Sequence, residues 1–320
     1  MKFGQFTQQE FIAANWEYFL NSIGGEVINT VNLKRPKVSD CVVAADLHTH
    51  PYISSRRDLY DTLDILVRNQ VGLCAMTVHG TGNEREMTYW QVKDVIKEDG
   101  LSIDLGFEDH GQAFTVKRKG RQLTLLPAYE ISVYVPGVNG TMDIIALMAD
   151  KKFTKAVTRQ AMCADDFLDI CHDHKAITIA AHPYTVHDPY GPGKFFKFRL
   201  ATEDERSAIA EHVFPHVDCI DLVATNVAWM TKSNRLVMQD YHGKPLANSD
   251  AHSTSHYTRM EIGRAGNIFQ IDFWNNGQQL REQLRKKISE GDFTPYLNYT
   301  PSLQFLFGVA FGNLSTNLSR

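Results

Sequence analysis

The chain has 320 residues, of which 43% are hydrophobic and 22% charged, a balance typical of a soluble globular protein. The net charge is −4 with no basic half, and no apolar run approaches the ~18 residues of a membrane span, so we expect neither a stable nucleic-acid partner nor a membrane protein. The five cysteines are scattered without a Cys-x-x-Cys pair, which favours a reduced, cytoplasmic protein that needs no disulfide bonds.

In chain order, the spacing of hydrophobic residues predicts one N-terminal helix and then strands that alternate with helices. The first helix covers Gln8–Ile23 and ends at Gly24-Gly25. The predicted strands are Val42–Leu47, Leu73–Val78, the hairpin pair Phe114–Lys117 and Gln122–Leu126, Met142–Met148, Ala176–Ala181, Cys219–Val223 and Pro245–Asn248. The further predicted helices are Asp58–Gln70, Glu84–Lys97, Ala164–His174, Glu203–Val213, Val227–Tyr241 and Gly277–Glu290.

This order of elements predicts an α/β fold. Near-continuous apolar strands between helices are typical of a parallel sheet that helices cover, and seven or so such units favour one closed barrel over an open sheet. We expect residues 40–320 to form this barrel, with 261–320 completing its wall and 1–40 forming a helical extension packed on it. In barrels of this kind the chemistry collects at the carboxyl ends of the strands. The oligomeric state stays open.

Imidazoles and carboxylates stand where the predicted strands end. The segment Asp46–His50, DLHTH, follows a buried strand, and its two histidines lie two residues apart, so both point to one side and can bind one ion. Taken alone, such a pair is more often two exposed histidines at the mouth of a loop. Seven side chains in the same position relative to strand ends favour a metal centre instead. They are His48, His50, His79, Glu130, His182, Asp250 and His252.

The donor set contains imidazole and carboxylate but no thiolate. This set suits Zn, Mn, Fe or Ni in a catalytic centre better than a structural zinc site, which usually includes cysteines. There are more ligands than one ion requires, and Glu130 is central enough to bridge, so we expect a cluster of two or three divalent ions. Such clusters polarise a phosphoryl oxygen and lower the pKa of a bound water from 15.7 toward ~7.

In this order, the segments DLHTH, TVHGTG, PAYE, AAHPY and NSDAHS resemble the motifs of the PHP (polymerase and histidinol phosphatase) family, over about residues 40–260. The resemblance implies a single distorted (β/α)7 TIM-like barrel with a trinuclear metal site that hydrolyses phosphoesters. It implies that Glu130, Asp250 and His252 are catalytic. It assigns one ion to His48, His50, Glu130 and Asp250, a second to Glu130 and His182, and a third to His79 and His252.

The chain departs from the family pattern at three places. Asp143 in MDIIAL stands where the family commonly has a histidine; an aspartate can ligate, so we expect it to bind metal, with a changed metal preference open. The segment Ser54–Arg57 replaces a usual acid or histidine, and Val78 replaces a usual aspartate. Because an arginine cannot ligate, we predict two tightly held ions, with a third site weak or occupied only when phosphate is bound. The alternative is that Asp58 or phosphate supplies the missing ligand.

The segment GPGKFFKFR, residues 191–199, combines basic and aromatic side chains after the His182 strand end. We interpret it as a loop over the site in which Lys197 and Arg199 bind substrate phosphate, and Arg56 is a further candidate; an ordinary surface loop fits equally well. The leading function is a metal-dependent phosphoesterase acting on a small phosphorylated metabolite or short nucleotide. The alternatives are a hydrolase of the metal-dependent amidohydrolase type and a metal-binding scaffold without catalysis.

Overall fold

The computed structural model describes residues 42–80, 87–98, 101, 105–157, 162–188, 198–224, 228–252 and 261–298. All of them belong to one compact unit, Asn32–Arg320. The predicted helix Gln8–Ile23 and the predicted extension 1–40 lie outside the described residues. No helix in the described ranges is long and apolar enough to cross a membrane.

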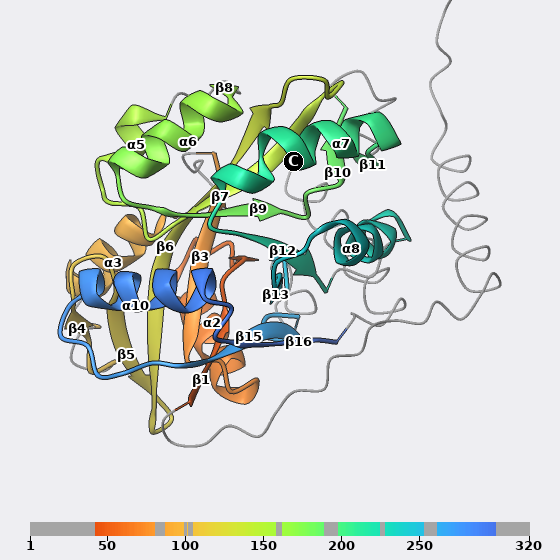
Figure 1. Cartoon of the computed structure of the whole chain (residues 1–320). Helices are drawn as coiled ribbons and strands as arrows, with labels where there is room; N and C mark the ends of the chain where they lie inside the picture. Colours follow the sequence, from red (N-terminus) through yellow and green to blue (C-terminus); the bar gives the residue numbers. More distant parts are fainter. Residues whose placement is uncertain are drawn as a thin grey trace, which may run out of the picture. The chain divides into compact units, whose positions relative to one another are not determined.

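Strands and helices alternate along much of this unit, as the hydrophobic spacing predicts (Figure 1). The strands are β1 Val42–Asp46, β2 Thr49–His50, β3 Leu73–His79, β4 Glu108–Asp109, β5 Phe114–Arg118, β6 Arg121–Tyr134, β7 Thr141–Leu147, β8 Met162–Cys163, β9 Ile177–Ala181, β10 Thr185–His187, β11 Phe198–Leu200, β12 Cys219–Val223, β13 Leu246–Asn248, β14 Ala251–His252, β15 Ala265–Gln270 and β16 Thr294–Leu297. The helices are α2 Arg56–Arg68, α3 Tyr89–Glu98, α5 Phe153–Ala156, α6 Ala164–Asp173, α7 Glu203–His212, the 3-10 turn η1 Phe214–His216, α8 Ala228–Asp240 and α10 Gly277–Ser289.

One 14-stranded mixed sheet carries the fold, with its main path in the order β13-β12-β9-β7-β6-β3-β1-β15-β16. The strands β1, β3, β6, β9, β12 and β13 run in one direction, whereas β7 and β15 run against their neighbours. The expected (β/α)7 arrangement is therefore wrong in strand number and direction. The reason for β7 is local: a turn through Gly137 and Gly140, both at positive φ, joins it directly to β6, and a hairpin makes neighbours antiparallel.

The two ends of the main path approach each other, so the sheet is nearly closed as a barrel. The side chain of Asn267 in β15 makes the connection to β13. Its Nδ2 donates to the carbonyl oxygen of Ala247 at 2.9 Å, and its Oδ1 accepts from the amide of Ala247 at 2.9 Å. The backbone groups of a sheet edge, which must be paired when buried, are thus satisfied by one amide side chain. Strands β15 and β16, within residues 261–298, form part of the wall, and the role predicted for 261–320 as a whole stays a prediction.

Every second residue of the wall strands points inside, because side chains two apart share a face of a sheet. The interior cluster is apolar, and leucines of α10 and Phe293 pack against it. Its members from the wall strands include Ala45, Leu73, Ala75, Leu126, Ala128, Ile145, Leu147, Ile177, Ile179, Cys219 and Leu246. The same rows, continued toward the carboxyl ends of the parallel strands, lead to His79, Glu130, Asp143 and Asp221. The strand register therefore turns these four polar side chains inward at one end of the barrel.

Strand β6 is longer than predicted. The sequence predicts an end at Leu126, before Pro127, but the strand continues to Tyr134 and Glu130 lies inside it. Proline is tolerated here because it falls between two ladders: β5 pairs with β6 up to Leu125, and β7 pairs with it from Ala128 onward. The missing amide of Pro127 therefore removes no bond from either antiparallel ladder.

Candidate metal centre

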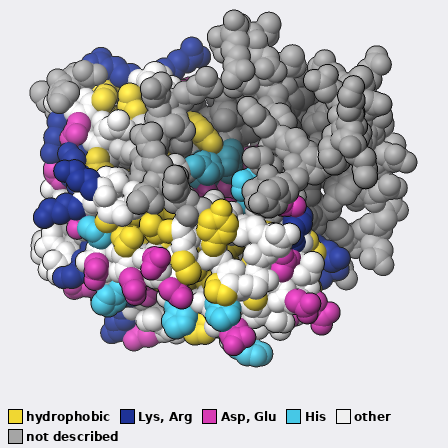
Figure 2. All heavy atoms as spheres, turned by 90° about the horizontal axis from the view of Figure 1, so that it is seen from above, with side chains coloured by type: hydrophobic (Ala, Val, Ile, Leu, Met, Phe, Trp, Pro, Cys, Tyr) yellow, Lys and Arg dark blue, Asp and Glu magenta, His cyan; other side chains and the backbone are white. Residues whose placement is uncertain are grey.

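The structure brings together all eight side chains that the sequence predicts as metal ligands. Histidine side chains, with an acidic side chain beside them, gather in a hollow of the face seen from above (Figure 2). They form three overlapping groups whose ligand atoms lie within 4.8 Å of one another or are joined to them by ion pairs. The residues are His48, His50, His79, Glu130, Asp143, His182, Asp250 and His252.

The central group consists of His48, His50, Glu130 and Asp250, and its atoms have the spacing of metal ligands. The two Nε2 atoms of the histidines lie 3.1 Å apart, and each lies 3.2–3.4 Å from an oxygen of Glu130. Asp250 Oδ1 lies 3.4 Å and 3.7 Å from the same two nitrogens. Ligands held at 2.0–2.1 Å around a tetrahedral ion are separated by about 3.3 Å. The donor atoms therefore fit one divalent ion between them.

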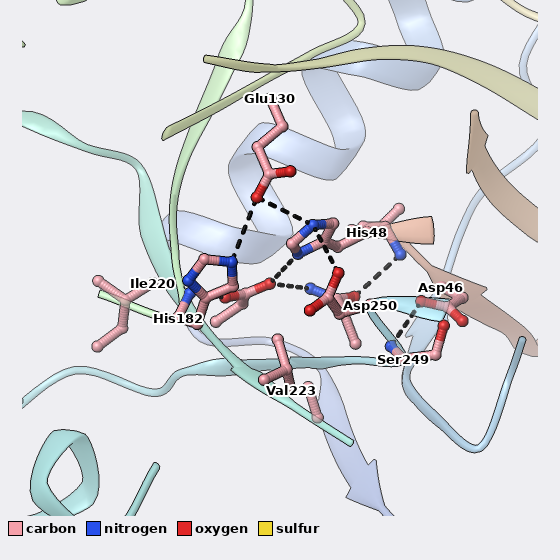
Figure 3. Close-up of polar contacts among 12 residues, drawn as sticks. Asp46, His48, Glu130, His182, Ile220, Val223, Ser249 and Asp250 are labelled. Atoms are coloured by element: carbon pink, nitrogen blue, oxygen red, sulfur yellow. Dashed lines mark hydrogen bonds and ion pairs between the residues drawn. The ribbon is translucent and has the colours of Figure 1, made fainter. Parts of the chain in front are cut away.

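The second group is rich in carboxylates. His182 Nε2 lies 3.3 Å from Glu130 Oε1, and Figure 3 shows Glu130 pointing toward both His48 and His182. Asp143 completes the group, and it accepts a hydrogen bond of 2.5 Å from the hydroxyl of Ser132, its partner in the β6–β7 ladder. Asp143 stands at the start of β7, but because β7 is antiparallel, that start lies at the carboxyl edge of the parallel strands.

The third group contains only imidazoles. His50 stacks on His79 with ring centroids 4.0 Å apart and on His252 with centroids 4.5 Å apart. The side chains of His79 and His252 are each 44% exposed, whereas the ligands of the other two groups are buried. The hydroxyl of Tyr52 lies 3.5 Å from His79 Nδ1. The third group thus opens to solvent at the mouth of the centre, and it has one imidazole more than the sequence assigned to it.

The segment Ser54–Arg57, where the PHP resemblance leads one to expect a metal ligand, caps a helix instead. Ser55 caps helix α2, with its hydroxyl accepting from the amide of Asp58, and the Asp58 carboxylate in turn accepts from the hydroxyls of Ser54 and Ser55. Arg56 opens the helix and is exposed. These contacts tie Asp58 to the cap, and it belongs to none of the donor groups found among the described residues.

Asp221 was missed by the sequence analysis. It is fully buried, and its carboxylate lies 2.9 Å from His48 Nδ1 and accepts from the backbone amide of His182 at 2.7 Å. The side chain of Asn248 donates to it as well, at 3.3 Å. A histidine that donates from Nδ1 to a carboxylate presents the lone pair of Nε2 to a metal. The sequence contained a signal for Asp221, because it follows Cys219 by two residues and so shares its inward face in β12.

Buried polar contacts also join the first motif, DLHTH, to the last, NSDAHS. Asp46 accepts from the backbone amides of Ser249 at 3.0 Å and Gly263 at 2.8 Å, and burial raises its pKa to about 6. Two of the ligands have left-handed backbones, His182 with φ +30° and Asp250 with φ +49°. Such conformations cost about 1–3 kcal/mol each and persist where the surrounding contacts enforce them.

The electrostatics of the centre favour cations at its core. Burial opposes a charge on His48, but the carboxylates of Asp250, Glu130 and Asp221 outweigh it and raise its pKa well above the usual range. Burial opposes a positive charge on His182, but the Glu130 carboxylate favours it, and the pKa of His182 rises to about 9. Burial together with the nearby His79 and His252 lowers the pKa of His50 well below its usual range. The pKa of Glu130 falls, despite burial, because His48 and His182 face it.

Metal binding is therefore expected to release protons at pH 7. In the metal-free protein His48 and His182 hold protons at that pH, since the pKa of His48 lies well above its usual range and that of His182 is about 9. An ion must displace them, so affinity should rise between pH 7 and pH 9. Titration calorimetry in two buffers of different ionisation enthalpy measures the protons released. A binding enthalpy that does not depend on the buffer would contradict this protonation state.

Of the three predicted phosphate-binding residues, Arg199 is already paired with another side chain. Both terminal nitrogens of Arg199 bond the Glu205 carboxylate at 2.6 Å, and one also bonds the carbonyl oxygen of Asn139 at 2.7 Å. These bonds join β11 to α7 and give Arg199 a structural partner. Lys197 lies outside the described residues. Arg56 is exposed on α2, as described above.

Comparison with solved structures shows what fold the chain shares. PsfC from Pseudomonas syringae PB-5123 is 13% identical with a TM-score of 0.54, over 87% of this chain and 99% of PsfC. The lesion-specific endonuclease PfuEndoQ from Pyrococcus furiosus is 15% identical with a TM-score of 0.47, over 79% of this chain and 57% of that one. A proposed metal-dependent phosphoesterase from Bifidobacterium adolescentis ATCC 15703 is 10% identical with a TM-score of 0.39, over 75% and 95%.

The likeness to PsfC shows the fold alone, and the two lower scores carry no argument. No protein-family model and no curated protein sequence matches the chain. The site itself has to indicate the chemistry.

Proposed function

We propose that this chain is a metal-dependent phosphoester hydrolase of the PHP type, built on one barrel over residues 40–320. One observation carries the proposal: the carboxylate of Glu130 lies 3.2–3.4 Å from nitrogens of His48, His50, His79 and His182, which come from three different parts of the chain. A buried carboxylate among four imidazoles is suited to bridge metal ions. Two ions, with a third position at the mouth, match the three donor groups; Zn, Mn and Fe all accept these donors.

Each part of the centre has a distinct task in this proposal. Divalent ions held there supply an ionised water at neutral pH and polarise a phosphoryl oxygen. Glu130 would be the carboxylate that two of the donor groups share. Asp250, next to His48 and His50, would orient the attacking water. When the third position holds no ion, His252 at the mouth would donate a hydrogen bond to the leaving oxygen. The catalytic roles of these three residues are part of the proposal.

The mouth of the centre supports a small substrate. The half-exposed side chains of His79 and His252 offer hydrogen bonds to a phosphate that approaches from solvent. Arg56 and Lys197 remain candidates for further phosphate contacts, whereas Arg199 would have to leave Glu205 to make one. A small phosphorylated metabolite or short nucleotide, hydrolysed in the cytoplasm, is therefore the proposed substrate.

A hydrolase of the amidohydrolase type is less well supported. That class often bridges its two ions with a modified lysine, whereas in this proposal Glu130 is the bridge, and the ion-pair partners of Glu130 and Asp250 among the described residues are histidines. The experiment below also tests whether the chain is a metal-binding scaffold without catalysis.

The test is a substrate panel with protein that is stripped by a chelator and then reloaded with Zn, Mn or Fe. The panel contains a phosphomonoester, a phosphodiester, an amide and a lactone. We expect hydrolysis of phosphoesters that depends on the added metal, and its loss in His182→Ala. The control variant His172→Ala removes an exposed histidine of α6 and should keep full activity. Preferred cleavage of the amide or lactone would favour the amidohydrolase alternative, and metal binding without any turnover would favour the scaffold.

A further inference from the structure

The three donor groups of the centre differ in chemistry, and the difference follows from where each group lies. Glu130, Asp143 and His182 supply two carboxylates and one imidazole, and all three are buried. His50, His79 and His252 supply imidazoles only, and two of them are half-exposed. The first group is here named the carboxylate subsite and the second the imidazole subsite.

We propose that the two subsites differ in metal preference, with the affinity for Mn²⁺ relative to Zn²⁺ higher at the carboxylate subsite than at the imidazole subsite. The inference rests on the proposed metal centre and does not depend on which ester it hydrolyses. The central group shares His50 with the imidazole subsite and Glu130 with the carboxylate subsite.

Ligand hardness is the first argument. Carboxylate oxygens suit hard ions such as Mn²⁺, and imidazole suits Zn²⁺. The order of intrinsic affinity favours Zn²⁺ over Mn²⁺ at any site with nitrogen and oxygen donors, so selectivity has to come from ligand type and geometry. The structure therefore predicts that the ratio of Mn²⁺ affinity to Zn²⁺ affinity differs between the subsites. The preference for Zn²⁺ should be weaker at the carboxylate subsite, which contains Asp143.

The second argument is charge and burial. Two carboxylates offset the full charge of a divalent ion, which lets the carboxylate subsite hold one out of contact with water. The hydroxyl of Ser132 bonds Asp143 Oδ1 at 2.5 Å and fixes that carboxylate in place. The imidazole subsite has no carboxylate among its own three donors, although Glu130 Oε2 lies 3.2 Å from His50 Nε2 and 3.3 Å from His79 Nε2. Its half-exposed position also lets solvent stabilise an ion there. The buried position thus requires the acidic donors, and the open one does not.

The experiment is a competition on the full chain, stripped and then loaded with equal concentrations of Mn²⁺ and Zn²⁺. Anomalous scattering from crystals, recorded on both sides of the zinc edge, gives the Mn:Zn ratio at each subsite. We expect the ratio at the carboxylate subsite to exceed that at the imidazole subsite by about tenfold or more, the size of effect that ligand environment has on affinity. Equal ratios at the two subsites would overturn the proposal, and so would an empty carboxylate subsite.

A pair of variants connects the ratio to one side chain. Asp143→His exchanges the carboxylate for an imidazole and should shift only its own subsite toward Zn²⁺, by about tenfold. Asp143→Asn keeps an oxygen donor without the charge, so its Mn²⁺ affinity, followed by electron paramagnetic resonance in solution, should fall while the imidazole subsite keeps its Zn²⁺. If Asp143→His fails to fold, the solution titration of Asp143→Asn decides. An unchanged Mn²⁺ affinity in that variant would contradict the proposal.

The two proposals fail in different ways. Unequal metal ratios in a protein that hydrolyses no phosphoester would leave this inference standing and remove the proposed reaction. Metal-dependent phosphoester hydrolysis with equal ratios at both subsites would do the reverse.

Discussion

Replacing Glu130 by glutamine is expected to cost the centre its bound metal and to lower the rate of phosphoester hydrolysis at least about a hundred-fold. The carboxylate belongs to two of the three donor groups and faces four imidazoles. Glutamine has nearly the same size, so the barrel should keep its packing. It lacks the negative charge that offsets the cations, and its amide hydrogens would point at nitrogens that must bind metal.

Elemental analysis and steady-state kinetics on the same preparation measure both effects. Glu108→Gln is the matched control, because its carboxylate is about half exposed and lies on β4, outside the donor groups. Near-normal turnover with full metal content in Glu130→Gln would show that this carboxylate does not bridge.

Asp221→Asn should weaken metal binding by about 10–100-fold, the usual cost of losing a carboxylate that orients a ligand histidine. Asp221 touches no ion in our proposal. It positions His48 through Nδ1 and, through the amide of His182, a second ligand. The asparagine can turn only one oxygen toward these two donors, so one of them loses its acceptor and the His48 ring loses its fixed orientation.

The readout for Asp221→Asn is the metal dissociation constant, measured by competition with a chelator, next to the melting temperature of the metal-free protein. Asp169→Asn, on the exposed side of α6, serves as control. A positioning role changes the dissociation constant far more than the melting temperature. A dissociation constant equal to that of the parent protein would assign Asp221 to the fold alone.

Much of the centre could be predicted from the sequence because strand ends and spacing are local properties. His48, His79 and His182 each follow a continuous apolar run, and such a run is what a buried strand needs. Asp250 and His252 are two residues apart, as His48 and His50 are. The two pairs lie side by side because β14 pairs with β2.

The remaining features depend on contacts between distant parts of the chain. The direction of β7 is an exception: the short turn through Gly137 and Gly140 that joins it to β6 is a local signal, which the sequence analysis did not use. That direction decides which end of the strand faces the candidate metal centre. The partner of Arg199 is Glu205 on α7, so a basic residue that looked available to phosphate is already paired. β15 was missed because Gly266 and Asn267 interrupt its apolar pattern, and both residues have a reason. A side chain at 266 would meet the hydroxyl of Tyr296 and the carbonyl of Ala45, and Asn267 bonds β13.

The bond between Asn267 and Ala247 has a consequence for how this architecture can vary. A barrel that closes through a continuous backbone ladder must match its strand number, tilt and shear, so adding or reversing one strand forces all the others to adjust. Here the side chains of Asn267 and Asn248 join β15 and β1 to β13, in place of a continuous backbone ladder. The wall can therefore include an antiparallel hairpin at β7 and a reversed β15 without losing closure. A seam of this kind makes the number of strands a variable trait, while the metal ligands keep their places at the rim.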